Sequence, residues 1–179
     1  MFLEPTTAYD FSAPLTGSQL VALAGLVYLL AVAPRLAWID ASTRRLPNRI
    51  VVPGIGVALV GELAATALDP RLSPRLATAL ACATTGFVLT LLAHLRFGLG
   101  MGDVKLYVLI ALVLGWLNPL LVPVVWLLAS VSGVLELAVR AVAKRTLRLT
   151  GTIALGPHLL AASATLCVLH FSGVAPLAS

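Results

Sequence analysis

Residues 50–68 read IVVPGIGVALVGELAATAL, and Glu62 is the only charged side chain in this run. A helix of this length extends about 28 Å at 1.5 Å per residue, which is close to the roughly 30 Å hydrocarbon core of a bilayer. The run therefore predicts a helix that crosses a membrane.

The whole chain has the same character. It has 179 residues, of which 60% are hydrophobic and 11% charged, whereas soluble domains average about 45–50% apolar and about 25% charged residues. Seven acidic and twelve basic side chains cannot cover the surface of a soluble globule of this size. A disordered chain is excluded as well, because it would need low hydrophobicity and high charge. The composition predicts an integral membrane protein.

Five further apolar segments are separated from residues 50–68 and from one another by polar or turn-rich residues. They predict an all-α, polytopic protein with six transmembrane helices at residues 18–39, 50–68, 76–95, 104–117, 120–142 and 152–171. The fourth helix would extend only about 21 Å, so it is expected to be short and buried or to continue past Asn118. The six helices would form one domain over residues 18–171, with an N-terminal tail at 1–17 and a C-terminal tail at 172–179.

The basic residues predict the topology. If six helices alternate in direction, ten basic residues lie in or beside the first, third and fifth connections, and two lie in the second. The larger group comprises Arg35, Arg44, Arg45, Arg49, Arg96, Lys105, Arg140, Lys144, Arg145 and Arg148. The positive-inside rule places these connections in the cytoplasm and both termini, together with the N-terminal tail, outside it. Joining the fourth and fifth helices would move residues 140–148 to the opposite side.

The net charge of +5 follows from this topology and from contact with anionic lipids, so a nucleic-acid partner is not expected. Cys82 and Cys167 lie in apolar runs without a CxxC pair, which predicts neither a disulfide framework nor a metal site. No basic residue precedes Arg35, so the first apolar segment is not expected to be a cleaved signal peptide. The sequence also contains no G-x-S-x-G, H-E-x-x-H or Walker motif.

Two carboxylates fall on the same predicted membrane face. Asp40 lies at the end of the first predicted helix, before the turn formed by Pro47-Asn48. Asp103 begins the fourth and ends a segment with glycines at positions 98, 100 and 102, which permit positive φ angles and close backbone approach. Alone, Asp103 is equally well explained as a helix cap and Asp40 as a boundary charge.

A close pair of carboxyl groups has a chemistry that neither has alone. Two like charges at a partly dry boundary cannot both ionise readily, so the pair tends to hold one shared proton. The ionised member can accept a proton from water, and the protonated member can donate to a carbonyl oxygen. This pairing would hydrolyse a peptide bond without a metal or a cofactor.

Other ionisable residues lie at predicted membrane depth, where such groups are often functional. His94 and His170 lie near helix ends, where a structural role suffices. Glu62 and Glu136 lie within helices and are expected to be protonated or hydrogen-bonded. His158 starts the sixth helix and is expected to form a helix-terminal hydrogen bond, with a position facing the site as the alternative.

These motifs resemble those of the type IV prepilin peptidases, intramembrane aspartic proteases of the GxGD class. The second aspartate motif of that family is reproduced in Gly100-Met101-Gly102-Asp103-Val104-Lys105-Leu106. Asp40 is followed by Leu46-Pro47-Asn48, as in the family's first motif, and Gly156-Pro157 opens the last helix. In this third motif Leu155 and His158 stand where the family often has aromatic residues. The resemblance extends over nearly all of residues 18–171.

The resemblance implies that Asp40 and Asp103 are the catalytic residues. It implies cleavage of pilin-like precursors at the cytoplasmic face of the inner membrane, after a basic leader that typically ends in glycine. Full-length members also carry a methyltransferase region with paired CxxC motifs, so this chain resembles a minimal, peptidase-only member of the kind associated with Flp or tight-adherence pili. No N-methylation is therefore expected. The supporting residues would be Pro47, Asn48, Gly100, Gly102, Gly156 and Pro157, which would shape the loops, and Lys105, which would orient a carboxylate or extend to lipid headgroups.

Three alternatives stay open. Boundary aspartates with Glu62 and Glu136 could serve a small proton or cation transporter, although the two halves of the chain show no internal repeat. A non-catalytic pilus assembly factor would have no need of either aspartate. A protease of this class could also act on preflagellins or competence pseudopilins.

Overall fold

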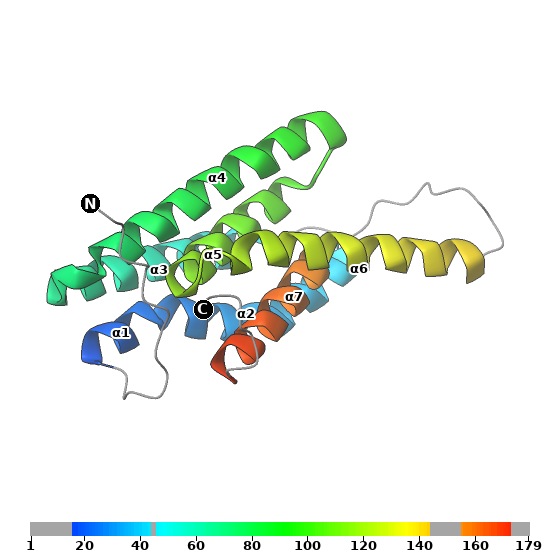
Figure 1. The fold of residues 1–179 in the computed structure, drawn as a ribbon. Helices are drawn as coiled ribbons and strands as arrows, with labels where there is room; N and C mark the ends of the chain where they lie inside the picture. The colour runs from blue at the N-terminus through cyan, green and yellow to red at the C-terminus, as the bar shows by residue number, and fades with distance from the viewer. Residues whose placement is uncertain (1–15, 44–45, 144–154, 173–179) are drawn as a thin grey trace.

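A computed structural model describes residues 16–43, 46–143 and 155–172, and every regular element in these ranges is helical. Figure 1 shows the helices in chain order. They are α1 (Gly17–Ala22), α2 (Ala24–Thr43), α3 (Asn48–Leu68), the 3₁₀ helix η1 (Pro70–Leu72), α4 (Ser73–Phe97), α5 (Met101–Leu117), α6 (Leu121–Ala143) and α7 (Leu155–Phe171).

Each of the six predicted helical segments is present. The first is divided at Leu23 into α1 and α2, and α2 continues to Thr43, so Asp40 lies inside its last turn rather than after it. The predicted fourth and fifth helices are separate, because the chain breaks after Leu117 and the Asn118 side chain accepts a hydrogen bond from the backbone N–H of Leu120 at 2.9 Å.

Four of the described helical segments are long and apolar enough to cross a bilayer. They cover Gly17–Thr43, Asn48–Leu68, Pro70–Phe97 and Leu121–Arg140. Helices α5 and α7 have 17 residues each and extend only about 26 Å. The count of six spans and the side of each terminus therefore stay predictions. Arg44, Arg45 and most of the basic cluster at 140–148, as well as the tails at 1–15 and 173–179, lie outside the described residues.

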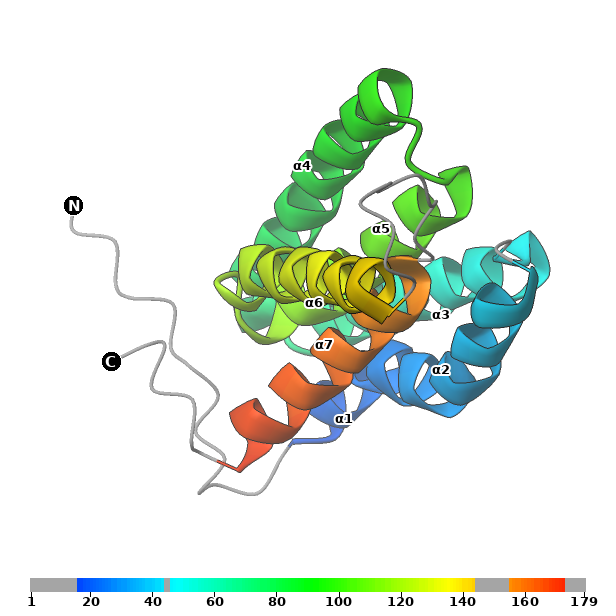
Figure 2. The ribbon, with the colours of Figure 1, turned by 90° about the vertical axis from the view of Figure 1, so that its right-hand side faces the viewer.

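Helix α5 forms the centre of the molecule. Twelve of its 17 residues are buried, and it packs against α2, α3, α4, α6 and α7, which lie around it in Figures 1 and 2. Its sequence permits this position, because a helix that is apolar on all sides can be covered by other helices as well as by lipid. The short fourth helix is thus a buried core helix, one of the two forms expected for it.

The outer helices present apolar side chains to the surroundings. Val60 of α3 is 67% exposed, and Leu89 of α4 and Leu127 of α6 are each 61% exposed. Apolar surface of this extent is unfavourable in water and is suited to the hydrocarbon core of a bilayer. The arrangement agrees with the membrane protein predicted from composition.

Small residues let α4 and α5 approach closely. A Cβ atom added at Gly86 would lie 2.8 Å from the ring of Tyr107, and one added at Gly115 would lie 2.9 Å from the Cβ atom of Cys82. On the other side, the Tyr107 hydroxyl donates to the backbone carbonyl of Val122 in α6 at 3.0 Å. Such close contacts and interhelical hydrogen bonds stabilise helix association where the hydrophobic effect is weak.

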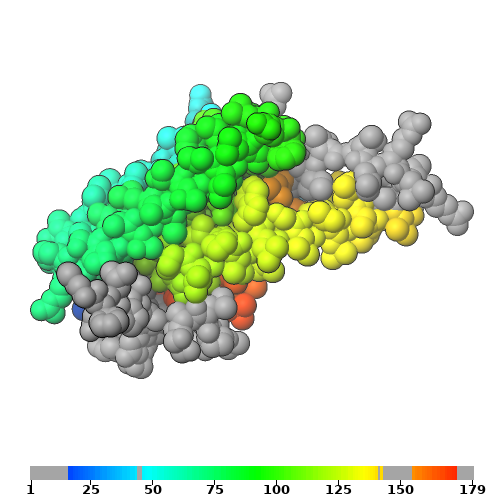
Figure 3. All heavy atoms as spheres, turned by 45° about the horizontal axis from the view of Figure 1, so that its top comes forward, coloured from blue at the N-terminus to red at the C-terminus, as the bar shows by residue number. Residues whose placement is uncertain are grey.

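An apolar cavity of about 990 Å³ lies between α4 and α6. Thr85, Gly86 and Thr90 line it from α4, Tyr107 from α5 and Trp126 from α6. Figure 3 looks onto this face, where α4 and α6 lie beside each other. Neither Asp40 nor Asp103 lines the cavity, so the aspartates form a separate site.

Candidate active site

Asp40 is buried where α2 ends against the start of α7. Asp40 is only 4% exposed, and its carboxylate lies directly against Gly156, whose Cβ position is 2.5 Å from Oδ2. Gly156 is in the first turn of α7, where backbone N–H groups have no partner within the helix and the helix dipole favours negative charge. The start of α7 is therefore a natural partner for a buried carboxylate.

The contact between Asp40 and Gly156 leaves no room for a side chain at position 156. A Cβ atom built on Gly156 would lie 2.5 Å from Oδ2 and 3.0 Å from Cγ of Asp40. Glycine at this position thus lets the backbone of α7 approach the carboxylate directly.

Asp103 lies in the first turn of α5, which begins after Gly100. The backbone N–H groups of Asp103 and Val104 donate to the carbonyl of Gly100 at 3.0 and 3.2 Å. The Asp103 side chain turns back over the helix start, because its Oδ2 atom is 3.0 Å from the Cβ position of Gly100. An acidic residue here is stabilised by the helix dipole, although Gly100, not Asp103, is the N-cap residue.

The three alternating glycines have different roles. Among the described residues only Gly98 has a positive φ, of 72°, and its N–H ends α4 by donating to the carbonyl of His94 at 3.0 Å. Gly100 has φ −60° and ψ 134°, which other residues can adopt. Gly102 permits a close approach, since a Cβ atom there would lie 2.8 Å from the Cβ atom of Leu46.

The fold brings Asp40 and Asp103 together from distant parts of the chain. The two carboxyl groups are close enough to interact electrostatically. Leu46 packs beside both, with its Cδ1 atom 3.5 Å from the Cβ position of Gly102 and 3.4 Å from that of Gly156. Oδ2 of Asp40 and Oδ1 of Asp103 are buried and make no hydrogen bond among the described residues. Each carboxyl group thus keeps an acceptor position for a water molecule or a peptide.

Lys105 and Asn48 connect the segments that carry the two aspartates. The Lys105 ammonium donates a hydrogen bond to Oδ1 of Asn48 at 3.1 Å. Pro47 is the N-cap residue of α3, and its carbonyl accepts from the N–H of Ile50 at 3.0 Å. In this structure the partner of Lys105 is therefore an amide oxygen, a contact that the sequence interpretation did not include.

The remaining candidate residues lie in four places. Glu62 is buried in α3, toward the end opposite Asn48, and His170 lies in the last turn of α7, away from Gly156. His94 forms a short hydrogen bond from Nδ1 to the carbonyl of Leu99 and holds the turn between α4 and α5. Glu136 and His158 are hydrogen-bonded to each other at 2.6 Å, near the start of α7.

Two contributions were not identified from the sequence. One is the close contact of the Gly156 backbone with the Asp40 carboxylate, which no side-chain pattern can reveal. The other is the position of Leu46 between Gly102 and Gly156. The sequence offered one signal for it, because Leu46 belongs to the Leu-Pro-Asn motif.

Comparison with known proteins identifies a family. Neither a search of curated proteins nor a search of solved structures found a match. A model of the type IV leader peptidase family matches residues 20–137, more than half of the chain and a range that includes both aspartates. With this match, the chain belongs to the type IV leader peptidase family.

Proposed function

We propose that the protein is an intramembrane aspartic endopeptidase that removes the leader peptide from type IV pilin precursors, with Asp40 and Asp103 as its catalytic pair. The family establishes a leader peptidase-like protease. The observation that carries the assignment of the pair is the meeting of a buried carboxyl group from α2 and a half-buried one from α5, each with a buried oxygen that has no partner among the described residues.

The first step is attack by water on the scissile carbonyl. Because Asp40 lies against the first turn of α7, where the helix dipole favours an ionised carboxylate, we assign Asp40 as the base that takes a proton from the water. Asp103 is then the protonated partner that donates its proton to the carbonyl oxygen as the water oxygen bonds to the carbon. The product is a neutral tetrahedral diol, with the proton now on Asp40.

The second step breaks the C–N bond. Asp40 returns its proton to the departing amine, and a hydroxyl of the diol gives a proton to Asp103 as the new carboxyl group forms. Both aspartates recover their starting states, and the net reaction consumes one water molecule. No metal or cofactor enters these steps.

The substrate we propose is a pilin-like precursor with an apolar helix preceded by a polar, basic leader. Its helix would lie in the bilayer while the leader stays in water, so the scissile bond falls at the boundary. The charge distribution of the chain favours the cytoplasmic boundary of the inner membrane. A glycine at the end of the leader would let the substrate backbone leave helical geometry and expose its carbonyl. Within this class we propose Flp-like pilins.

The test is a cleavage assay with the purified full chain in lipid nanodiscs and a Flp-type pilin precursor. Asp40→Asn and Asp103→Asn should each abolish the product while the helical circular-dichroism spectrum is retained. The matched control is Asp69→Asn, since Asp69 caps η1 in the connection between α3 and α4 and should be dispensable. Wild-type activity in either variant at position 40 or 103 would contradict the assignment. Precursors of other pilins and of preflagellins, assayed in parallel, define the substrate.

A further inference from the structure

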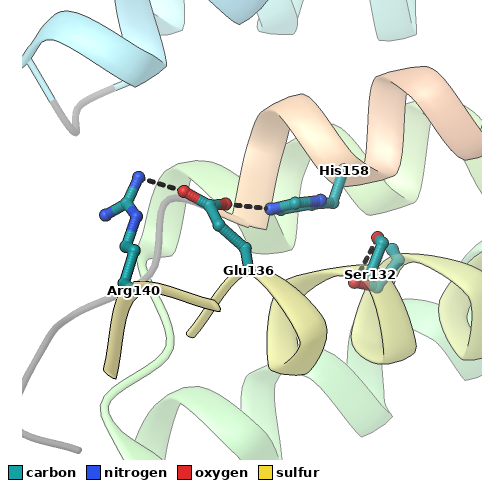
Figure 4. Close-up of polar contacts among 5 residues, drawn as sticks. Ser132, Glu136, Arg140 and His158 are labelled. Atoms are coloured by element: carbon teal, nitrogen blue, oxygen red, sulfur yellow. Dashed lines mark hydrogen bonds and ion pairs between the residues drawn. The ribbon is translucent and has the colours of Figure 1, made fainter. Parts of the chain in front are cut away.

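Three polar side chains lie where the C-terminal half of α6 meets the first turn of α7. Glu136 of α6 accepts a hydrogen bond from Nε2 of His158 through Oε2, at 2.6 Å, and its other oxygen forms an ion pair with Arg140 one turn further along α6. Figure 4 shows Glu136 between the two partners, with one carboxylate oxygen directed to each. We call these residues the α6–α7 clamp.

The clamp acts on the same turn of α7 that contacts Asp40. Gly156, Pro157 and His158 are consecutive in the first turn of the helix. Proline fixes φ near −65° and leaves this turn little freedom of its own. A displacement of His158 therefore moves the backbone of Gly156, which lies directly against the carboxylate of Asp40.

Apolar packing alone is enough to hold α6 and α7 side by side. The two helices pack against each other, and Leu159, Leu160 and Leu166 of α7 are buried. The ion pair is partly exposed, with the Arg140 side chain 57% and the Glu136 side chain 33% exposed, so it adds at most about 1 kcal/mol to stability. Packing between smooth apolar faces permits a helix to slide or rotate, whereas a directed hydrogen bond at its first turn limits both.

We propose that His158, Glu136 and Arg140 are positioning residues, which hold the start of α7 so that the backbone of Gly156 lies against Asp40. The proposal rests on the proposed function, because positioning of Asp40 affects the reaction only if Asp40 is catalytic. They act through Gly156 and do not touch the reacting atoms.

Two substitutions of His158 separate the hydrogen bond from the packing of the ring. His158→Phe keeps a planar ring and removes the donor, whereas His158→Gln keeps an N–H donor at a similar reach. A misplacement of about 1 Å can lower a rate by about 100-fold. We expect His158→Phe to lower kcat by at least about tenfold with KM within about twofold, and His158→Gln to retain kcat within about threefold of the wild type.

A double-mutant cycle tests whether the clamp acts as a unit. Glu136→Leu should lower kcat as much as His158→Phe, and the double variant should be no worse than either single variant, because one interaction is lost in all three. Ser132→Ala is the matched control. Ser132, which Figure 4 shows on the same helix as Glu136, lies one turn before it, and its hydroxyl donates to the carbonyl of Ala129 within α6. The Ser132→Ala variant should have the same kcat as the wild type.

A distance measurement makes the proposal testable without cleavage. Spin labels at Ala41 in α2 and Ala161 in α7, two exposed positions, report the separation of the helix ends by double electron–electron resonance in a variant without Cys82 and Cys167. The distance distribution should be narrow in the wild type and in His158→Gln, and broader or displaced in His158→Phe. An unchanged distribution in His158→Phe, or an equal loss of kcat in the Gln and Phe variants, overturns the proposal. If the wild type fails to cleave the precursor but the distributions differ as expected, the clamp stands and the proposed function fails.

Discussion

Lys105 donates a hydrogen bond from its ammonium group to the side-chain oxygen of Asn48, 3.1 Å away, and this bond joins α5 to the start of α3. Close beside it, Leu46 packs against Gly102. The segment that follows Asp40 and the segment that carries Asp103 are therefore joined by one polar and one apolar contact. Because the two aspartates come from different helices, their relative placement depends on these two contacts.

Loss of the hydrogen bond between Lys105 and Asn48 should weaken catalysis moderately. The hydrogen bond is solvent-exposed, so we estimate its contribution at about 1 kcal/mol, which corresponds to about a fivefold change in rate. Lys105→Met and Asn48→Ala should each lower kcat/KM of precursor cleavage by about that factor, and the double variant by no more than either single variant.

Arg49→Met supplies the control for this pair, since it removes a neighbouring basic charge from the same helix start without removing the hydrogen bond. Its activity should stay close to that of the wild type. If kcat/KM fell equally in the variants at positions 49 and 105, net charge would explain the effect. That result would contradict a role for the hydrogen bond between Lys105 and Asn48.

Disruption of the contact between Gly102 and Leu46 should lower activity more strongly. In Gly102→Ala the new Cβ atom would lie 2.8 Å from the Cβ atom of Leu46 and 3.4 Å from its backbone nitrogen, so the backbone itself has to move. We expect cleavage to fall by about 100-fold and the free energy of unfolding to fall by about 1–3 kcal/mol. Gly56→Ala is the matched control, because its Cβ atom meets nothing within 4 Å. That variant should be fully active and more stable by about 0.5–1 kcal/mol. Comparable losses in both variants would rule out steric conflict as the cause.

Most of the fold follows from the apolar pattern. Six apolar segments predicted six helices, and breaks at Asn118 and Asp69 were visible as polar interruptions. The pattern also indicated that the helix at 104–117 was too short to be an ordinary span, and α5 is the buried centre. Hydropathy could not give the break at Leu23 or the extension of α2 past Asp40, since neither changes the apolar character of the segment.

The candidate site was predicted in part. Topology was sufficient to expect Asp40 and Asp103 on one membrane face, and the structure brings them together. The contacts that position them depend on backbone atoms and on tertiary approach. The contact of Gly156 with Asp40, the fit of Leu46 against Gly102 and the pairing of His158 with Glu136 join segments far apart in the chain. Of the clamp, only the i, i+4 spacing of Glu136 and Arg140 was a signal within the sequence.

A side chain at position 156 should abolish activity without unfolding the protein. In Gly156→Ala the Cβ atom would lie 2.5 Å from Oδ2 of Asp40, and the carboxylate has to rotate away from Gly156 and out of its present position. We expect precursor cleavage to fall by at least about 100-fold, with helical content and the thermal midpoint close to those of the wild type, because a side chain can move more easily than a helix. A large drop in the thermal midpoint would instead indicate that α7 is displaced as a whole.

The buried carboxyl group of Glu62 should be dispensable for cleavage. Glu62 lies about 21 Å along α3 from Asn48 at 1.5 Å per residue, it is 1% exposed, and its Oε2 atom has no partner among the described residues. Burial of a carboxyl group costs more than burial of an amide, so Glu62→Gln should leave cleavage within about twofold of the wild type and keep or raise the thermal midpoint. A transporter that moves protons or cations through Glu62 would lose its transport with the same substitution. Precursor cleavage and ion flux in proteoliposomes, measured on one preparation, separate the two functions: ion flux that disappears in Glu62→Gln would support the transporter, whereas unchanged cleavage without flux in either protein supports the peptidase.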